Sequence, residues 1–226
     1  MQVTHLFLDA DQTLFDFERA ERAAFTAICL ELSLPHDGQL YQLYSDINAR
    51  MWALLEQGGI TKTALRRERF RLWLEAAGFS ADLEALSDGY TRYLGEMAFL
   101  FPGAEEFCRA AARKYPLYLA TNGIAAVQRG RLARSPLANV FRKVYVSEDL
   151  GCEKPSPDFF LRMLADAGAK AENSLMVGDS LRADIAGAQG VGMKACWYNP
   201  HSVGAGNAKP DYIAHSYEEL YRLLEL

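Results

Sequence analysis

The sequence contains few cysteines, and none of them is placed for a metal or redox motif. Four occur in 226 residues, widely scattered and without any pair at two-residue spacing: Cys29, Cys108, Cys152 and Cys196. Disulfide frameworks and zinc sites both need clustered cysteines at characteristic spacings. We therefore expect reduced, mostly packed thiols in a cytoplasmic protein.

Long apolar runs, low-complexity tracts and internal repeats are also missing. The run Leu6-Phe7-Leu8 near the N-terminus is far too short for a signal peptide or a membrane span. Positive charge is not in excess either, because the formal net charge is -5 at pH 7. We expect neither a nucleic-acid partner nor a membrane partner, and an anionic substrate would need local positive charge or a metal.

What the sequence does contain is an alternation of short apolar runs with segments of helical periodicity. Half of its residues are hydrophobic and 23% are charged, as in ordinary soluble globular proteins. Over residues 1–16 and 99–226 the alternation predicts an α/β, Rossmann-like core with a mostly parallel sheet. The predicted strands span residues 3–8, 117–120, 144–146, 175–177, 195–197 and 212–213.

Residues 17–98 interrupt this alternation, because they carry no strand signal. Apolar residues at helical spacing predict about four helices there, the last with an amphipathic stripe over residues 83–97. Pro35 stops the first helix, while Thr61 and Gly78 are suited to begin and end the third. We expect this block to be a helical cap domain inserted into the core.

The most unusual feature is the pair of carboxylates in Asp9-Ala10-Asp11, directly after the first predicted strand. Ligands bind beyond the carboxyl ends of strands in open α/β sheets, and residues at i and i+2 can share one side of an extended stretch. One carboxylate could attack a substrate or hold a metal while the other handles a proton. The alternative is a turn in which Asp9 and Asp11 merely cap backbone N–H groups.

Two further predicted strands end in residues suited to a phosphate. Thr121-Asn122-Gly123 supplies a hydroxyl, an amide and a glycine turn that leads into a helix, which together could cradle an anion. Lys154, followed by a proline, could place a compact positive charge on a phosphate. The alternatives are an ordinary helix cap for Thr121 and a solvated surface position for Lys154.

A fourth predicted strand ends in Gly178-Asp179, with Asp184 five residues further on. Hard oxygen ligands on separate loops suit Mg²⁺ better than a soft metal. The alternative is that Asp179 caps the following helix and that Asp184 interacts with the dipole of its first turn.

In this order, the four groups resemble the motifs of the haloacid dehalogenase-like phosphohydrolases, over essentially the whole chain. The matching residues are Asp9 to Thr13 for the first motif, Thr121 for the second, Lys154 for the third, and Gly178-Asp179 with Asp184 for the fourth. The helical block stands where that family carries a mobile helical cap. The resemblance therefore implies both the fold predicted above and a phosphoryl-transfer activity.

For catalysis, the resemblance implies that Asp9 is a nucleophile that forms an aspartyl-phosphate. Asp11 would protonate the leaving alkoxide and then deprotonate the attacking water. Dehalogenases of this family lack that second aspartate, so its presence favours phosphate-ester chemistry, although a mutase would also retain it. Closure of the cap would exclude water and help to keep Asp11 protonated.

The resemblance also implies a magnesium ion and a set of groups around the phosphoryl oxygens. The implied metal ligands are the Asp9 carboxylate, the Asp11 backbone carbonyl and Asp179, with Asp184 supporting them. The implied groups around the phosphoryl oxygens are Thr121, Asn122, Gly123 and Lys154.

Within the family, Gln12 and the segment after it resemble the pyrimidine 5′-nucleotidase branch. Further positions that look similar to this branch are Asn48, Trp52, Glu56, Arg69, Phe70 and Gln128. Trp52 and Phe70 could stack on a base, or they could belong to the core of the cap. Four arginines between residues 66 and 71 could attract an anion, although a solvated helix face is the usual interpretation.

The sequence therefore predicts a magnesium-dependent phosphomonoester hydrolase whose partner is a small molecule, most simply a pyrimidine nucleoside 5′-monophosphate. One alternative is a phosphatase for another small phosphomonoester, such as phosphoglycolate or a sugar phosphate. The other is a non-catalytic binding protein on the same fold, since fold does not fix function. The complete set of acidic, hydroxyl and lysine positions weighs against that second alternative.

Overall fold

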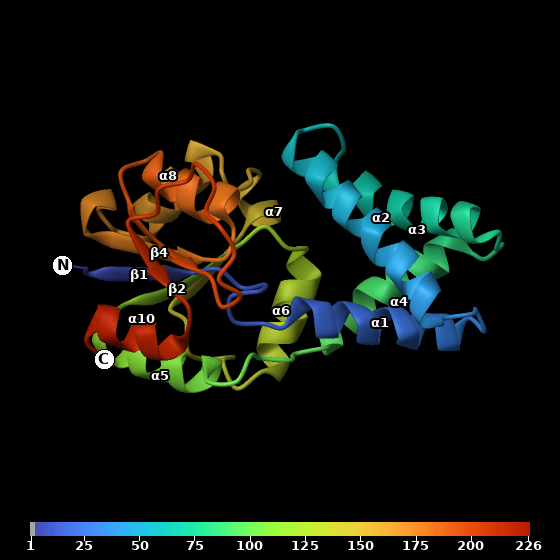
Figure 1. Cartoon of the computed structure of the whole chain (residues 1–226), viewed down its shortest axis with the longest axis horizontal. Coiled ribbons are helices and arrows are strands. Elements are labelled where there is room, and N and C mark those ends of the chain that lie inside the picture. The colour runs from blue at the N-terminus through green and yellow to red at the C-terminus, as the bar shows by residue number, and fades with distance from the viewer. Residues whose placement is uncertain (1–2) are drawn as a thin grey trace. The chain divides into compact units, whose positions relative to one another are not determined.

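The structure is a computed structural model that describes residues 3–226. It divides into two compact units (Figure 1). The α/β unit contains the chain up to Phe17 together with Ala98–Leu226, and the helical unit is Glu18–Met97. Among the described residues, none of the helices is both long and apolar enough to cross a membrane.

The α/β unit is built on a six-stranded sheet in which every neighbouring pair of strands is parallel, in the order β3-β2-β1-β4-β5-β6. Its strands are β1 (His5–Leu8), β2 (Leu117–Thr121), β3 (Lys143–Val146), β4 (Ser174–Gly178), β5 (Lys194–Tyr198) and β6 (Tyr212–Ala214). The predicted α/β class and parallel sheet are confirmed. Because β1 lies between β2 and β4, the strand order reverses at its side, which is where open α/β sheets bind their ligands.

Helices cover both faces of this sheet. They are α5 (Ala104–Lys114), α6 (Ala125–Arg134), α7 (Ser147–Leu150), α8 (Pro157–Ala167), α9 (Gly187–Gln189) and α10 (Tyr217–Leu224), with a 3-10 turn at Ala171–Asn173. Figure 1 shows α5 and α10 on one face and α8 on the other. Alternation along β1 matches this arrangement, since Leu6 and Leu8 join the core under α5 and α10 whereas Phe7 joins the core under α8.

The segment after β4 differs from the single helix that the sequence predicts. A π-helical turn, η2 (Leu181–Ala186), precedes the short α9. The N–H groups of Asp184 and Ile185 both donate to the carbonyl of Ser180, at 3.0 and 3.2 Å, so the backbone is locally wider than an α-helix. Such turns occur frequently at functional sites, and this one carries Asp184.

The helical unit contains four helices: α1 (Phe17–Glu31), α2 (Gly38–Glu56), α3 (Lys62–Ala77) and α4 (Leu83–Glu96). The predicted ends of α3 are confirmed, because Thr61 accepts a hydrogen bond from the N–H of Ala64 and Gly78 has a left-handed backbone with φ of 72°. The first helix ends before Pro35, as expected. Aromatic side chains fill the centre of this unit, with Tyr44 stacked between Phe25 and Phe70.

Candidate active site

Asp9 and Lys154 form the centre of the site. Asp9 directly follows β1, and its N–H donates to the carbonyl of Val177 on β4 at 2.9 Å, which fixes the backbone at this point. The Lys154 Nζ donates to Asp9 Oδ1 at 2.6 Å, to Asp184 Oδ1 at 2.6 Å and to the carbonyl oxygen of Ala120 at 2.8 Å. Lys154 is only 3% exposed, so the surface-lysine alternative is wrong.

Asp184 and Asp179 complete an acidic cluster with Asp9. One carboxylate oxygen from each of the three residues lies within 4.8 Å of the others. A Cβ atom at Gly178 would collide with the carboxylate of Asp184, so glycine at the end of β4 makes room for this ligand. The second oxygen of Asp184 accepts from the backbone N–H of Ser180 at 3.1 Å.

The electrostatics of the cluster favour a divalent cation. Burial raises the pKa of Asp9 well above its ordinary value, and burial together with the charge of Asp184 raises that of Asp179 to about 7. Burial lowers the pKa of Lys154, but the charges of Asp184 and Asp9 outweigh that effect and keep it above its ordinary value. When all three carboxylates are ionised, they exceed the charge of the Lys154 ammonium by two, and hard oxygen donors of this kind fit Mg²⁺.

The Asp11 carboxylate has separate partners, both on α6. Its Oδ1 accepts from Arg131 Nη1 at 2.6 Å, and its Oδ2 accepts from Gln128 Nε2 at 2.6 Å. Arg131 was not among the residues that sequence reasoning selected, and Gln128 was noted only as a resemblance to one branch. Their i, i+3 spacing, just beyond the Thr121-Asn122-Gly123 turn, is the signal that could have found them.

The turn after β2 excludes the helix-cap alternative for Thr121 and shows a structural role for Asn122. The Thr121 hydroxyl accepts from the N–H of Gly123 at 3.0 Å, whereas α6 has Ile124 at its N-cap, so Thr121 is not the cap of this helix. Asn122 was predicted to bind phosphoryl oxygens. In the structure, its side-chain amide donates to the carbonyl and accepts from the N–H of Lys154, both at 2.8 Å. Asn122 therefore holds the lysine loop in place.

Phe70 is not placed to contact a substrate, which corrects its assignment as a substrate-binding residue. It has no exposed surface, and its ring stacks on Tyr44 with centroids 5.0 Å apart and packs edge-on against Tyr90. Phe70 lies in the core of the helical unit, which is the alternative that the sequence left open for it. Trp52 differs, because it is half-buried on α2 with the Lys62 ammonium 6.0 Å from its ring centre.

A polar network accounts for two other positions of the helical unit. Arg69 Nη1 donates to Asn48 Oδ1 at 3.1 Å, and Asn48 Nδ2 donates to Glu21 Oε1 at 2.6 Å, all three side chains being buried. The neighbouring arginines form ion pairs with acidic side chains of their own unit. These pairs are Arg66–Asp88, Arg67–Glu84, Arg71–Glu68 and Arg71–Glu75. The arginines at positions 66, 67 and 71 thus pair with acidic side chains of the helical unit, whereas Arg69 is buried.

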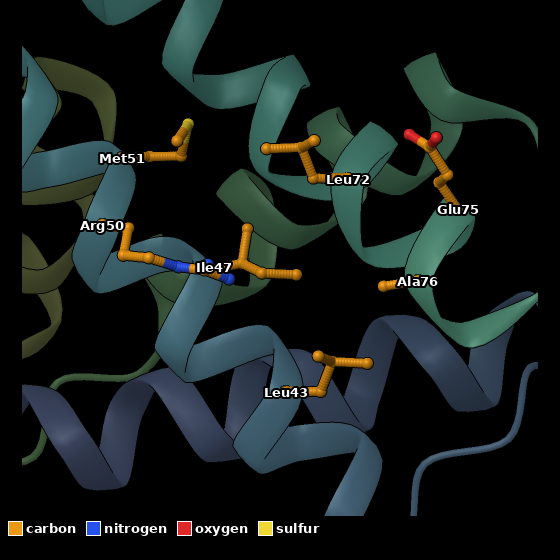
Figure 2. Close-up of a pocket in the computed structure, with 7 residues that line it drawn as sticks. All are labelled: Leu43, Ile47, Arg50, Met51, Leu72, Glu75 and Ala76. Carbon is orange, nitrogen blue, oxygen red and sulfur yellow. The ribbon is translucent and has the colours of Figure 1, made fainter.

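A groove between α2 and α3 lies wholly within the helical unit. Figure 2 shows Ile47 of α2 facing Leu72 and Ala76 of α3. The lining residues are Leu43, Ile47, Arg50, Met51, Leu72, Glu75 and Ala76. Arg50 is the one basic residue of this lining and Glu75 the one acidic residue, so the groove does not resemble a site for an anionic substrate. Neither Trp52 nor Phe70 lines it.

Known proteins of one family resemble this chain along nearly its whole length. The family model described as haloacid dehalogenase-like hydrolase matches residues 3–192. Pyrimidine 5′-nucleotidase PynA of Streptococcus pneumoniae is 38% identical, covering 97% of this chain and 94% of its own. Pyrimidine 5′-nucleotidase YjjG of Escherichia coli is 30% identical, covering 97% and 96%.

A solved structure extends the similarity to three dimensions. The putative HAD-hydrolase YfnB of Bacillus subtilis, in a crystal form bound to magnesium that is described as revealing interdomain movement, superposes with a TM-score of 0.93. It is 32% identical, and the match covers 100% of both chains.

Proposed function

This chain belongs to the haloacid dehalogenase-like hydrolases, and we propose that it is a magnesium-dependent phosphatase acting on pyrimidine nucleoside 5′-monophosphates. The observation that carries the proposal is that Lys154 lies buried between the carboxylates of Asp9 and Asp184. Asp11, two residues after Asp9, supplies the second carboxylate that the reaction needs. Two relatives that match nearly all of the chain are named pyrimidine 5′-nucleotidases, which supports the substrate class.

In the first half of the proposed reaction, an oxygen of Asp9 attacks the phosphorus of the substrate. The bond between phosphorus and the ester oxygen breaks, and Asp11 gives a proton to the leaving alkoxide. Lys154 holds Asp9 Oδ1 at 2.6 Å, so the nucleophile has a fixed orientation before the substrate arrives. Its ammonium also offers positive charge to the phosphoryl oxygens, with the Thr121 hydroxyl as a second group suited to that role.

In the second half, Asp11 takes a proton from a water molecule that attacks the same phosphorus. The bond to Asp9 then breaks, which releases inorganic phosphate and restores the Asp9 carboxylate. We assign Asp9, Asp179 and Asp184 with the backbone carbonyl of Asp11 as the groups that hold Mg²⁺. When bound, this ion supplies a Lewis acid that offsets the negative charge of the phosphoryl group.

We further propose that the α/β unit is the catalytic core and that the helical unit is a cap that selects the substrate. The interdomain movement described for the magnesium-bound Bacillus subtilis relative supports a mobile cap. Trp52 is one of the aromatic residues of the helical unit that are only half-buried, so its ring is available to stack on a base. The four cysteines are free, which supports a cytoplasmic protein.

The proposed function is tested by phosphate release with Mg²⁺ from a panel of small phosphomonoesters. The panel contains UMP, dUMP, dTMP, purine monophosphates, phosphoglycolate and hexose phosphates, with Asp9→Asn as the inactive control. We expect the highest kcat/KM for the pyrimidine monophosphates. A preference for phosphoglycolate or a hexose phosphate would contradict the substrate class, and release that survives Asp9→Asn would contradict the mechanism.

A further inference from the structure

Both oxygens of the Asp11 carboxylate are engaged by side chains that the mechanism above does not use. Arg131 binds one oxygen and Gln128 the other, each at 2.6 Å. The two donors are almost completely buried, with exposed fractions of 0% and 2%, whereas the Asp11 side chain is 27% exposed. The partly exposed Asp11 carboxylate thus accepts hydrogen bonds from two buried side chains.

The donors owe their fixed positions to α6 and to the turn before it. Gln128 and Arg131 are three residues apart, so they project from the same face of the helix. Gly123 makes room for the first of them, because a Cβ atom there would collide with the amide of Gln128. The start of α6 is anchored as well, since the Glu148 carboxylate accepts from the N–H of Ala125 at 2.7 Å.

Within residues 3–226, the hydrogen-bond partner of the Arg131 guanidinium is the Asp11 carboxylate. Its guanidinium lies 4.6 Å from the ring centre of Phe15, which belongs to the same turn as Asp11. Among the described residues, its Nε and Nη2 atoms have no hydrogen-bond partner, and its one ion pair is with Asp11. Burial of a guanidinium is costly unless its charge is compensated, and Asp11 supplies that compensation.

We propose that Gln128 and Arg131 are positioning residues that orient the Asp11 carboxylate for the hydrolysis of the aspartyl-phosphate. This inference rests on the proposed function. A carboxylate oxygen that accepts one hydrogen bond keeps a further lone pair, so Arg131 and Gln128 can fix the direction of the Asp11 carboxylate and still leave it able to take a proton from water. The observed contacts therefore suit the second half of the reaction, in which Asp11 removes a proton from water.

The two halves of the reaction can be separated with p-nitrophenyl phosphate. Its leaving group departs as p-nitrophenolate with the electron pair of the broken bond and needs no proton, so attack by Asp9 is independent of Asp11. The water that then attacks the phosphorus must still pass a proton to Asp11. Loss of the positioning residues should consequently slow only the second half with this substrate.

The test uses Arg131→Met and Gln128→Met, which keep an unbranched side chain of similar length and remove the donors. With p-nitrophenyl phosphate and Mg²⁺, we expect kcat to fall roughly 10- to 100-fold in each variant. KM should fall with it, leaving kcat/KM close to the wild-type value. Stopped-flow traces should show a burst of p-nitrophenolate that approaches one per active site. With a pyrimidine monophosphate, whose alkoxide needs a proton, kcat/KM should also fall.

Arg134→Met is the matched control, because Arg134 lies one turn along α6 with its side chain exposed. Its kinetic constants should equal those of the wild type. Circular dichroism and the Mg²⁺ concentration for half-maximal activity should be unchanged in all three variants, which excludes a general loss of structure. Two independent variants keep the test decisive if one of them folds poorly.

The outcomes separate this inference from the proposed function. An active wild type with unchanged kcat in both variants would overturn the positioning role and leave the phosphatase intact. A fall in kcat/KM for p-nitrophenyl phosphate without a burst would also overturn it, because it would indicate damage to the first half of the reaction. A wild type that hydrolyses no phosphomonoester would overturn the proposed function, and the positioning role with it.

Discussion

Lys154 is the residue on which the charge balance of the site depends. Its ammonium group donates three hydrogen bonds, to two carboxylates and one backbone carbonyl, all at 2.8 Å or less. A buried lysine in an apolar setting would lose its proton easily, but Asp9 and Asp184 keep this one charged. It can therefore both orient the Asp9 carboxylate and compensate the negative charge of a phosphoryl group.

The first prediction concerns the removal of this charge. Lys154→Met should lower the free energy of unfolding of the metal-free protein by about 3 kcal/mol, because two buried carboxylates lose their partner. Activity should fall by roughly 100-fold or more, since both the orientation of Asp9 and the positive charge are lost. Urea unfolding and phosphate release measure the two effects. If metal-free Lys154→Met unfolded with the same free energy as the wild type, Lys154 would not be needed to compensate the two buried carboxylates.

A second prediction follows from the raised pKa of Asp179, which lies at about 7 in the folded protein against 3.8 for an ordinary aspartate. The folded state keeps this proton where the unfolded state has released it. In the metal-free protein, this group therefore reduces stability as pH rises from about 4 to about 7, with no further change above. Mg²⁺ must displace the same proton, so its affinity should rise as the pH increases through about 7.

Titration calorimetry at pH 6, 7 and 8 checks this dependence. The magnesium dissociation constant should fall as the pH rises from 6 to 7. Asp179→Asn, which carries no titratable proton, should weaken binding and flatten the profile. An affinity that is equal at all three pH values in the wild type would contradict the assignment of Asp179 as a ligand.

At the scale of elements, the ends of the strands define the site. The sequence located β1, β2 and β4 because each is a short apolar run followed by polar residues and glycine, a pattern with few alternatives. It did not anticipate the π-helical turn after β4 or the four-residue helix α7. Elements this short contain too few residues to show a period, and a π turn depends on which carbonyl accepts each N–H.

The glycine that ends β4 gives a third prediction. Gly178→Ala places a methyl group against the Asp184 carboxylate, so that side chain must move out of the cluster. We expect Mg²⁺ affinity to fall at least about tenfold and the unfolding free energy to fall by roughly 1–3 kcal/mol. Gly38→Ala is the control, because the start of α2 has open space around Gly38. Unchanged Mg²⁺ binding in Gly178→Ala would show that Asp184 is not required in its present position.

At the scale of the whole molecule, parallel strand order assembles residues that are far apart in the chain. The order of β2, β1 and β4 places Thr121, Asp9 and Asp179 at three neighbouring strand ends. The βα alternation was sufficient to predict this convergence, since the carboxyl ends of parallel strands share one edge. The partners of Asp11 could not be predicted in the same way, because periodicity does not show which residue of α6 faces another loop.

The helical unit shows the same limit. Its periodicity identified the buried faces, yet it could not tell a residue of the core from one that faces a ligand. Phe70 belongs to the core, and Asn48 and Arg69 belong to a buried network with Glu21. Buried polar side chains of this kind are satisfied by partners on other helices, which no local pattern specifies.

The central claim is that Asp9 becomes phosphorylated during turnover, and chemical trapping tests it most directly. An acyl phosphate is reduced by sodium borohydride to the corresponding alcohol, which converts the modified aspartate into homoserine. Quenching the enzyme with borohydride during turnover of UMP, followed by peptide mass spectrometry, should place homoserine at position 9. Quenched samples without substrate, or of Asp9→Asn, should contain none. Turnover of UMP without any reduction at position 9, or with reduction at another aspartate, would contradict the account.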